Sequence, residues 1–208
     1  MIKNNIRRES YLKFLNTWKN RDLIKVLSGV RRSGKSTLLA MSQQDLKEQG
    51  VQDENIIAIN FEYMEFEELT DYRKLHDYVL SKVDKNKKNY VFLDEIQHVQ
   101  NFEKVVDSLY IRDYIDLYIT GSNAFFLSGE LATLLTGRYI EQHVLPLSFQ
   151  EFKQWHTENN PTIQQLSNRD LYAMYTRSSF PYTLAMTNQQ ETYDYLQAVY
   201  ASVMFKDE

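Results

Sequence analysis

The sequence predicts a three-layer α/β fold, in which a five-stranded, mostly parallel sheet lies between helices and a small helical subdomain follows. Short apolar, β-branched runs alternate with segments of helical periodicity from residue 22 to residue 145. After Ser148 the strand signal fades and helical spacing continues. We therefore place a sheet domain at residues 1–147 and a helical subdomain at residues 148–208. A chain of 208 residues is long enough for both.

The expected elements follow one another in β-α order. Helical spacing of apolar residues predicts helices over residues 11–18, 35–49, 72–83 and 102–109. Apolar runs predict strands over residues 22–28, 56–61, 90–93 and 115–120, and a fifth strand is expected over residues 139–145, where Pro146 stops it. The continuous apolar run at residues 56–61 is typical of a parallel strand that is covered on both faces. In the subdomain, helices are expected around Phe149 to Trp155 and around Leu196 to Val203.

Composition excludes several classes of protein. The 24 Lys and Arg residues against 28 Asp and Glu give a net charge of -4, which argues against a surface wholly built for nucleic acid. Cysteine is absent from the sequence, so disulfides, thiolate metal sites and thiol nucleophiles are excluded. No apolar run approaches the roughly 20 residues of a membrane-spanning helix. We expect a soluble, cytoplasmic protein without a membrane partner.

A phosphate-binding loop is indicated between the first strand and the next helix. The motif G-x-x-x-x-G-K-[ST] is matched by Gly29, Val30, Arg31, Arg32, Ser33, Gly34, Lys35 and Ser36. A chance match in a chain of this length is expected on the order of one time in a hundred. Glycines let successive N–H groups point at phosphate, and the helix dipole favours the anion. Lys35 is expected on the β- and γ-phosphates, the Ser36 hydroxyl on Mg²⁺, and Thr37 on the α-phosphate side.

An acidic pair ends the third expected strand. Asp94 closes an apolar run, so its carboxylate should emerge at the carboxyl edge of the sheet, where the phosphate loop also lies, and hold Mg²⁺ through water. Glu95 follows and is the candidate that polarises the attacking water. Gln97 and His98 come next, and either could approach the γ-phosphate. No two histidines have the spacing of metal ligands, so magnesium is the only metal we expect.

Taken together, five stretches resemble AAA-type P-loop ATPases, and specifically a prokaryotic family whose ATPase domain precedes a C-terminal domain of unknown function. The matching stretches are residues 29–39, 93–97, 120–122, 135–138 and 146–149. The resemblance implies an AAA-like sheet with the fourth strand between the first and third, and it implies that this chain is an N-terminal fragment. It also favours ATP over GTP. One departure is Ser178-Ser179-Phe180-Pro181, where the family usually carries a Gly-Gly-Phe-Pro-like turn.

The resemblance implies two further catalytic residues. Asn123 or Ser122 resembles the polar sensor of the γ-phosphate at the end of the fourth strand. Arg138 resembles an arginine finger, which a neighbouring subunit often delivers, and this reading implies a homo-oligomer. The alternative for Arg138 is a cation at a helix C-terminus.

Two functions use these same residues. The first is an enzyme acting on acid anhydrides, a Mg²⁺-dependent ATPase that converts ATP to ADP and phosphate. The alternative is an ATP-gated switch, in which nucleotide binding alters a partner contact and hydrolysis is slow. A protein or nucleic-acid target is expected to bind through the absent C-terminal region.

Overall fold

The computed structural model describes residues 6–121, 135–159, 166–186 and 188–204, and the structural statements below refer to these residues. Residue contacts divide them into two units. The sheet unit comprises Glu9–Gly29 and Lys35–Val144, and the helical unit comprises the described parts of Met1–Arg8, Val30–Gly34 and Leu145–Glu208. The domain boundary after residue 147 stays a prediction.

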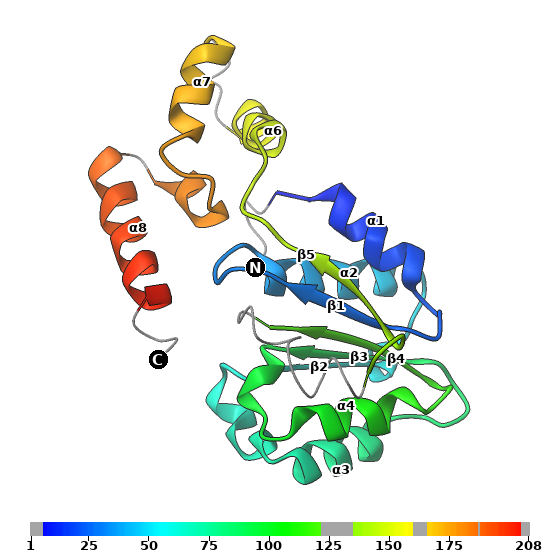
Figure 1. Cartoon of the computed structure of the whole chain (residues 1–208). Helices are drawn as coiled ribbons and strands as arrows, with labels where there is room; N and C mark the ends of the chain where they lie inside the picture. The colour runs from blue at the N-terminus through cyan, green and yellow to red at the C-terminus, as the bar shows by residue number, and fades with distance from the viewer. Residues whose placement is uncertain (1–5, 122–134, 160–165, 187, 205–208) are drawn as a thin grey trace. The chain divides into compact units, whose positions relative to one another are not determined.

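The sheet unit contains a five-stranded sheet with the order β2-β3-β4-β1-β5 (Figure 1). Its strands are β1 (Ile24–Ser28), β2 (Ile56–Asn60), β3 (Asn89–Asp94), β4 (Ile115–Thr120) and β5 (Tyr139–His143). All four neighbouring pairs are parallel. The expected fold class and the expected place of the fourth strand between the first and third are confirmed. All the carboxyl ends of the strands therefore lie at one edge.

Helices cover both faces of this sheet. Helices α1 (Glu9–Trp18) and α2 (Lys35–Glu48) lie on one face, and α3 (Tyr72–Lys82) and α4 (Phe102–Tyr110) on the other (Figure 1). Successive side chains of a strand point to opposite faces. Accordingly Val91 and Leu93 pack with α3 and α4, whereas Phe92 packs with α1 and α2. The described part of the unit also has the 3-10 segments η1 (Asp53–Asn55), η2 (Met64–Thr70) and η3 (Ile96–His98).

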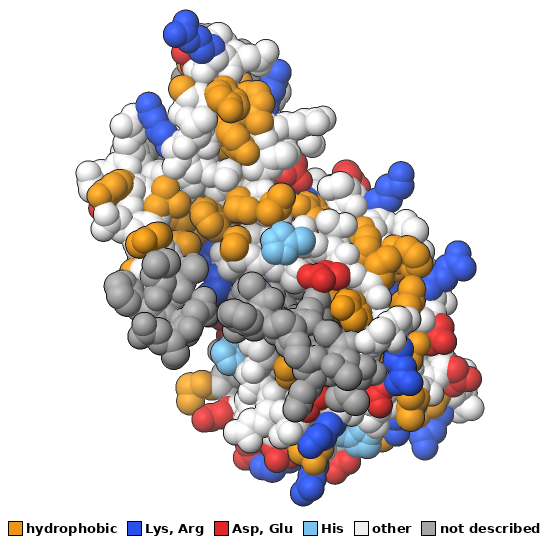
Figure 2. All heavy atoms as spheres, viewed as in Figure 1, with side chains coloured by type: hydrophobic (Ala, Val, Ile, Leu, Met, Phe, Trp, Pro, Cys, Tyr) orange, Lys and Arg blue, Asp and Glu red, His pale blue; other side chains and the backbone are white. Residues whose placement is uncertain are grey.

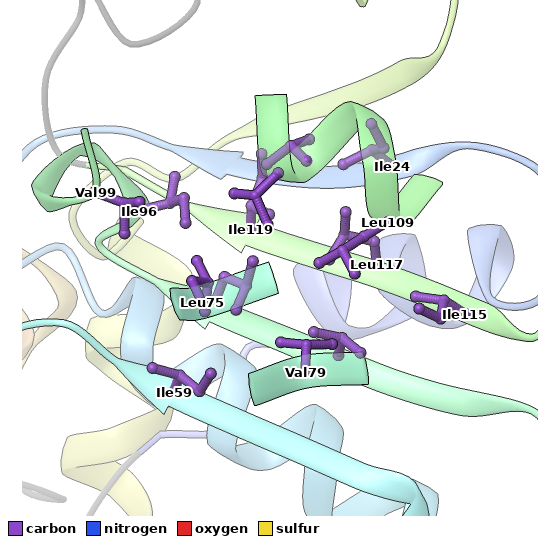
Figure 3. Packing of buried hydrophobic residues seen from close by; sticks show 14 of the residues in the cluster. Ile24, Ile59, Leu75, Val79, Ile96, Val99, Leu109, Ile115, Leu117 and Ile119 are labelled. Carbon is purple, nitrogen blue, oxygen red and sulfur yellow. The ribbon is translucent and has the colours of Figure 1, made fainter. Parts of the chain in front are cut away.

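The larger core shows how α3 and α4 are fixed. Leu75 and Val79 of α3 and Leu109 of α4 are fully buried against the sheet. Figure 3 shows them beside the strand residues Ile59, Ile115, Leu117, Ile119 and Ile24. Ile96 and Val99, which follow β3 directly, join the same core. Core packing therefore holds the chain before the Asp94-Glu95 pair, through Leu93, and after it, through Ile96 and Val99. This packing fixes the position of the acidic pair.

The helical unit contains α6 (Phe149–Asn159), α7 (Asn168–Tyr175), the 3-10 segment η6 (Pro181–Ala185) and α8 (Gln189–Met204). Its core is Ile6, Leu147, Phe152, Trp155 and Leu184. Helix α7 was not predicted from the sequence pattern. That helix starts at a capping box in which Ser167 and Asp170 bond each other's backbone N–H groups, which satisfies donors at the helix N-terminus.

Charge is distributed rather than gathered on the visible surface. Figure 2 shows Lys and Arg side chains interspersed with Asp and Glu. None of the helices in the described parts of the chain is long and apolar enough to cross a membrane.

Candidate functional site

The loop after β1 has a backbone that requires glycine. Gly29 has a φ of 132°, and a Cβ at this position would overlap the carbonyl oxygen of Val144. Gly34 has a φ of 101°. Side chains of L-residues disfavour both conformations, and Arg32 at 64° is a further residue in the left-handed region. The two glycines of the motif thus have a conformational reason as well as a chemical one.

Lys35 begins α2 and is almost completely buried, with 3% of its surface exposed. Its Nζ donates to the carbonyl oxygen of Gly29 at 3.1 Å. The same Nζ lies 3.7 Å from Oε1 of Glu95. Lys35 therefore links the start of the phosphate loop to the end of β3, and it brings a positive charge to the carboxyl edge of the sheet.

Asp94 and Ser36 lie together at this edge. The Ser36 side chain hydrogen-bonds to the Asp94 carboxylate, which also accepts from the Thr120 hydroxyl and from Nδ2 of Asn60 at 2.8 Å. Burial raises the pKa of Asp94, while the hydrogen bonds from Thr120 and Ser36 act in the opposite direction. A carboxylate beside a serine hydroxyl supplies the hard oxygen ligands that Mg²⁺ prefers.

Glu95 adopts a left-handed backbone conformation, with φ 58° and ψ 47°. A non-glycine residue in this region costs roughly 1–2 kcal/mol, and such strain gathers at functional sites. The backbone N–H of Glu95 donates to Oγ1 of Thr120 at 2.9 Å. Its Oε2 accepts from Nε2 of Gln97 at 2.6 Å. The carboxylate is therefore held between Gln97 on one oxygen and Lys35 on the other.

Sequence reasoning missed two residues of this cluster, Asn60 and Thr120. Each is the last residue of its strand, β2 and β4 respectively, and β3 lies between those strands. Asn60 is paired directly with Asp94 in the sheet register. A polar residue that closes an apolar run was the available signal, because parallel strands end at one edge.

The residues present fit a magnesium nucleotide. Among the residues that the structure describes, the buried atoms Ser33 Oγ and Gln97 Oε1 have no hydrogen-bond partner. Buried polar atoms normally have one, so each is an open position for a ligand or water. The glycine conformations, the Lys35 cation, and the Ser36 and Asp94 oxygens match what phosphate and Mg²⁺ need.

The structure does not bring Arg138 to Lys35 and Glu95 of the same chain. The carbonyl oxygen of Arg138 accepts from the N–H of Ile24, at the amino end of β1. A strand of five residues spans roughly 16 Å, so this is the far edge of the sheet from Gly29. The guanidinium forms an ion pair with Asp107 and lies 5.7 Å from the centre of the Tyr110 ring.

The remaining expected site residues lie as follows. Thr37 is in the first turn of α2 and is half-buried. Val30 and Arg31 belong to the loop segment of the helical unit, where the Arg32 guanidinium lies 5.2 Å from the centre of the Tyr195 ring. Asn123 and its alternative Ser122 lie outside the described residues.

Solved structures of low sequence identity share this fold. A Walker-type ATPase of Pyrococcus abyssi matches all of this chain and 77% of its own, with a TM-score of 0.63 and 14% identity. The AMPPCP-bound DnaA of Aquifex aeolicus matches 96% of this chain and 65% of its own, with a TM-score of 0.56 and 14% identity.

Two relatives align by sequence, and both are described as uncharacterized proteins. One from Haemophilus influenzae is 40% identical over 209 residues, which cover all of this chain and 51% of the relative. One from Methanocaldococcus jannaschii is 38% identical over 142 residues, which cover 65% of this chain and 29% of the relative. The chain thus spans about half or less of the length of these relatives.

A family model described as an AAA domain matches residues 21–153. This match contains the phosphate loop, the acidic pair and the whole sheet. The expectation of an AAA-type P-loop family is confirmed, and the chain belongs to the AAA domain family.

Proposed function

We propose that this chain is a Mg²⁺-dependent ATPase that converts ATP to ADP and phosphate. One observation carries the proposal. The pairs Lys35-Ser36 and Asp94-Glu95 are about 60 residues apart in the sequence, yet they meet at the carboxyl edge of the sheet of an AAA domain. Positioning and charge supply the catalysis in phosphoryl transfer, and this cluster offers both.

Each residue has one role in this proposal. Lys35 binds the β- and γ-phosphates, and Ser36 and Asp94 hold Mg²⁺. Bound Mg²⁺ would supply positive charge that offsets the negative charge of the phosphate groups. Glu95 orients and polarises the attacking water through its carboxylate, which has to leave Lys35 and Gln97 for that task.

Two residues would complete the site. Asn123, or Ser122, acts as the sensor of the γ-phosphate at the end of β4. Arg138 acts in the site of a neighbouring subunit, since in its own chain it lies beside Ile24 at the far edge of the sheet. This role requires a homo-oligomer. Membership in the AAA domain family supports a preference for ATP over GTP.

A nucleotide-gated switch with slow hydrolysis is the second candidate. The contacts of Glu95 favour it: its carboxylate is engaged by Lys35 and Gln97, and its strained backbone is stabilised by Thr120. A ligand that draws Lys35 to phosphate would release Glu95 and alter the segment after β3. A partner contact with that segment would then report the bound nucleotide.

The residues described above do not identify the cellular target. We propose a protein or nucleic-acid target that is bound by the region beyond these residues, since the relatives are about twice as long or longer. A cytoplasmic location belongs to the same proposal.

Phosphate release from Mg-ATP tests the two candidates. Release is measured over a range of protein concentrations for the unmodified chain, Lys35→Ala and Glu95→Gln, with ATP binding measured for each. A hydrolase loses release in both variants and keeps ATP binding in Glu95→Gln. Release that rises more than proportionally with concentration supports a shared site. Binding without release in the unmodified chain overturns autonomous hydrolysis and favours the switch.

A further inference from the structure

Arg8 is an almost completely buried arginine in the helical unit, with 3% of its surface exposed. Its guanidinium makes five hydrogen bonds to residues in the described part of the chain. Nε and Nη2 donate to the two carboxylate oxygens of Glu151 at 2.8 and 3.2 Å. Nη1 donates to the carbonyl oxygens of Ser33 at 3.1 Å and Leu145 at 2.9 Å, and Nη2 also donates to that of Pro146 at 3.2 Å. The number of bonds equals the five N–H donors that a guanidinium has.

These bonds join three segments that are far apart in the sequence. Ser33 belongs to the phosphate loop, Leu145 and Pro146 follow β5, and Glu151 lies in the first turn of α6. Glu151 is itself fixed, because its Oε2 accepts from the N–H of Ser148 at 2.7 Å. Burying a guanidinium is expensive unless its donors are all satisfied, so this junction is held in one geometry.

Other residues of the helical unit also flank the loop. Arg32 lies over the Tyr195 ring of α8, and a Cβ at Gly34 would come within 3.7 Å of Cγ of Pro181 in η6. The loop segment Val30–Gly34 is accordingly grouped with the helical unit rather than with the sheet. Among these contacts, that of Arg8 is a hydrogen bond to the loop backbone, at the carbonyl oxygen of Ser33.

The bond to Ser33 fixes the orientation of one peptide group. A trans peptide is planar, so the carbonyl of Ser33 and the N–H of Gly34 point in opposite directions. Arg8 holds the carbonyl on its own side and thereby turns the Gly34 N–H away from itself. A phosphate loop works by presenting such N–H groups to the anion.

We propose that Arg8 is a positioning residue of the phosphate loop, which orients the Ser33–Gly34 peptide for a nucleotide phosphate and links that peptide to the first turn of α6. The inference rests on the proposed function, because it takes the loop to bind nucleotide. It assigns to Arg8 no contact with the nucleotide. Because the same guanidinium holds Glu151, nucleotide binding and the order of α6 are coupled, and by linkage each stabilises the other.

Lysine cannot replace this arginine. A lysine ammonium offers three N–H donors from one atom, whereas the acceptors here surround a planar fork. The variant Arg8→Lys keeps the charge and loses the geometry, so it isolates positioning from electrostatic attraction. The matched control is Arg7→Lys, because Arg7 is the preceding residue and is exposed.

The test measures the Kd of MgADP by calorimetry, together with the unfolding midpoint and the circular dichroism spectrum, for both variants and for Lys35→Ala. Loss of a charge-assisted hydrogen bond predicts a Kd about tenfold higher in Arg8→Lys, at a temperature where that variant is fully folded. Arg7→Lys should bind within twofold of the unmodified chain. Hydrogen exchange gives a second readout: MgADP should slow exchange at residues 149–153 in the unmodified chain and not in Arg8→Lys.

The outcomes separate this inference from the function on which it rests. If Arg8→Lys is folded and binds MgADP within twofold of the unmodified chain while Lys35→Ala loses binding, the role of Arg8 is wrong and the nucleotide site stands. If the unmodified chain binds no nucleotide, both are wrong. Should Arg8→Lys fail to fold, exchange in the unmodified chain decides: protection confined to the loop overturns the coupling, and protection that extends to residues 149–153 supports it.

Discussion

Two buried lysines lie near opposite ends of strand β1, and each faces a carboxylate. Lys25 lies within the strand and pairs with Asp116 of β4. Lys35 lies beyond the phosphate loop and pairs with Glu95 after β3. Both pairs belong to the sheet unit and both are nearly inaccessible to solvent. Their surroundings differ, and the difference separates a pair that holds the fold from a pair that is suited to act.

The Lys25 pair is fully enclosed by fixed partners. Asp116 accepts the Tyr118 hydroxyl at 2.9 Å and the N–H of Asn20 at 3.0 Å, in addition to Lys25. Lys25 also donates to the carbonyl oxygen of Arg21 at 3.2 Å. Burial lowers the pKa of Lys25, and the charge and hydrogen bond of Asp116 oppose that effect. Such a satisfied network in regular strands has one arrangement.

The Lys35 pair is looser. Its nitrogen and oxygen are 3.7 Å apart, which is beyond hydrogen-bond distance. Glu95 has a strained backbone and a second contact with Gln97. Neither member of the pair lies inside a strand, since Glu95 follows the end of β3 and Lys35 begins α2. We infer that burial alone does not distinguish structural from functional charges. The distinction lies in whether the pair is locked by direct bonds within regular structure.

The largest expected effect is on stability, from breaking the locked pair. Lys25→Met leaves the Asp116 carboxylate buried without its cation, and the loss of one partner of a buried pair costs about 3–5 kcal/mol. The free energy of unfolding in urea measures this loss. The double variant Lys25→Met/Asp116→Leu should recover most of it, because no isolated charge then remains. A loss below about 1 kcal/mol in Lys25→Met would contradict the view of a locked pair.

For the looser pair of Lys35 and Glu95, we expect a substitution to reduce activity strongly and stability little. Glu95→Gln keeps the shape of the side chain and removes its basicity, so phosphate release should fall by about a hundredfold or more. The free energy of unfolding should change by less than about 1 kcal/mol. Glu67→Gln, on an exposed residue of η2, is the control. Unchanged release in Glu95→Gln, beside an active unmodified chain, would remove Glu95 from the chemistry.

The sheet and the acidic pair were predictable because their signals are local. Mostly apolar runs mark the first four strands, and Gly29 to Ser36 and Asp94-Glu95 are contiguous motifs. The place of the fourth strand between the first and third came with the resemblance to a known family rather than from the runs themselves. Strand ends were less well placed: β5 ends at His143 rather than at residue 145.

The roles of Asn60, Thr120 and Arg8 were not predicted, because they depend on strand register or on contacts between residues far apart in the sequence. Asn60 reaches Asp94 because β2 pairs with β3 in that register, and the role of Thr120 likewise depends on β4 lying next to β3. Arg8 is 25 residues from Ser33 and 143 from Glu151, so no local pattern singles it out. The sensor role of Asn123 stays a prediction.

A third pair, Arg8 with Glu151, tests an intermediate case. The Glu151 side chain is 17% exposed, so its charge is less enclosed than that of Asp116. Glu151→Gln should cost about 1–2 kcal/mol at neutral pH, through loss of charge-assisted hydrogen bonds. Nucleotide affinity should fall less than in Arg8→Lys, since the bond from Arg8 to Ser33 remains while the link to α6 is weakened.

The pH dependence of this third pair has a definite sign. Burial alone would raise the pKa of Glu151, but hydrogen bonds from Arg8 and Ser148 hold that pKa below its ordinary value of 4.5. A lowered folded-state pKa gives stability that is present above pH 4.5 and is lost as the pH falls through the folded pKa. The difference in unfolding free energy between the unmodified chain and Glu151→Gln should therefore shrink from pH 7 to pH 4. A constant difference would show that Glu151 stabilises the protein without its charge.

The smallest effect on stability is expected at the exposed pair of Arg138 and Asp107, whose side chains are 44% and 38% exposed. Surface ion pairs contribute at most about 1 kcal/mol, so Asp107→Asn and Arg138→Ala should both unfold close to the unmodified chain. Their activities should differ, because only Arg138 is proposed to serve a neighbouring site. A mixture of Glu95→Gln and Arg138→Ala subunits provides the decisive measurement. In that mixture an Arg138→Ala subunit keeps Glu95 and can receive the missing arginine from its neighbour, so phosphate release should exceed the sum of the two variants alone. If mixing gives no gain at concentrations where the unmodified chain is active, Arg138 has no role in a neighbouring site. Its role is then limited to the surface ion pair with Asp107, which connects α4 to the residue before β5.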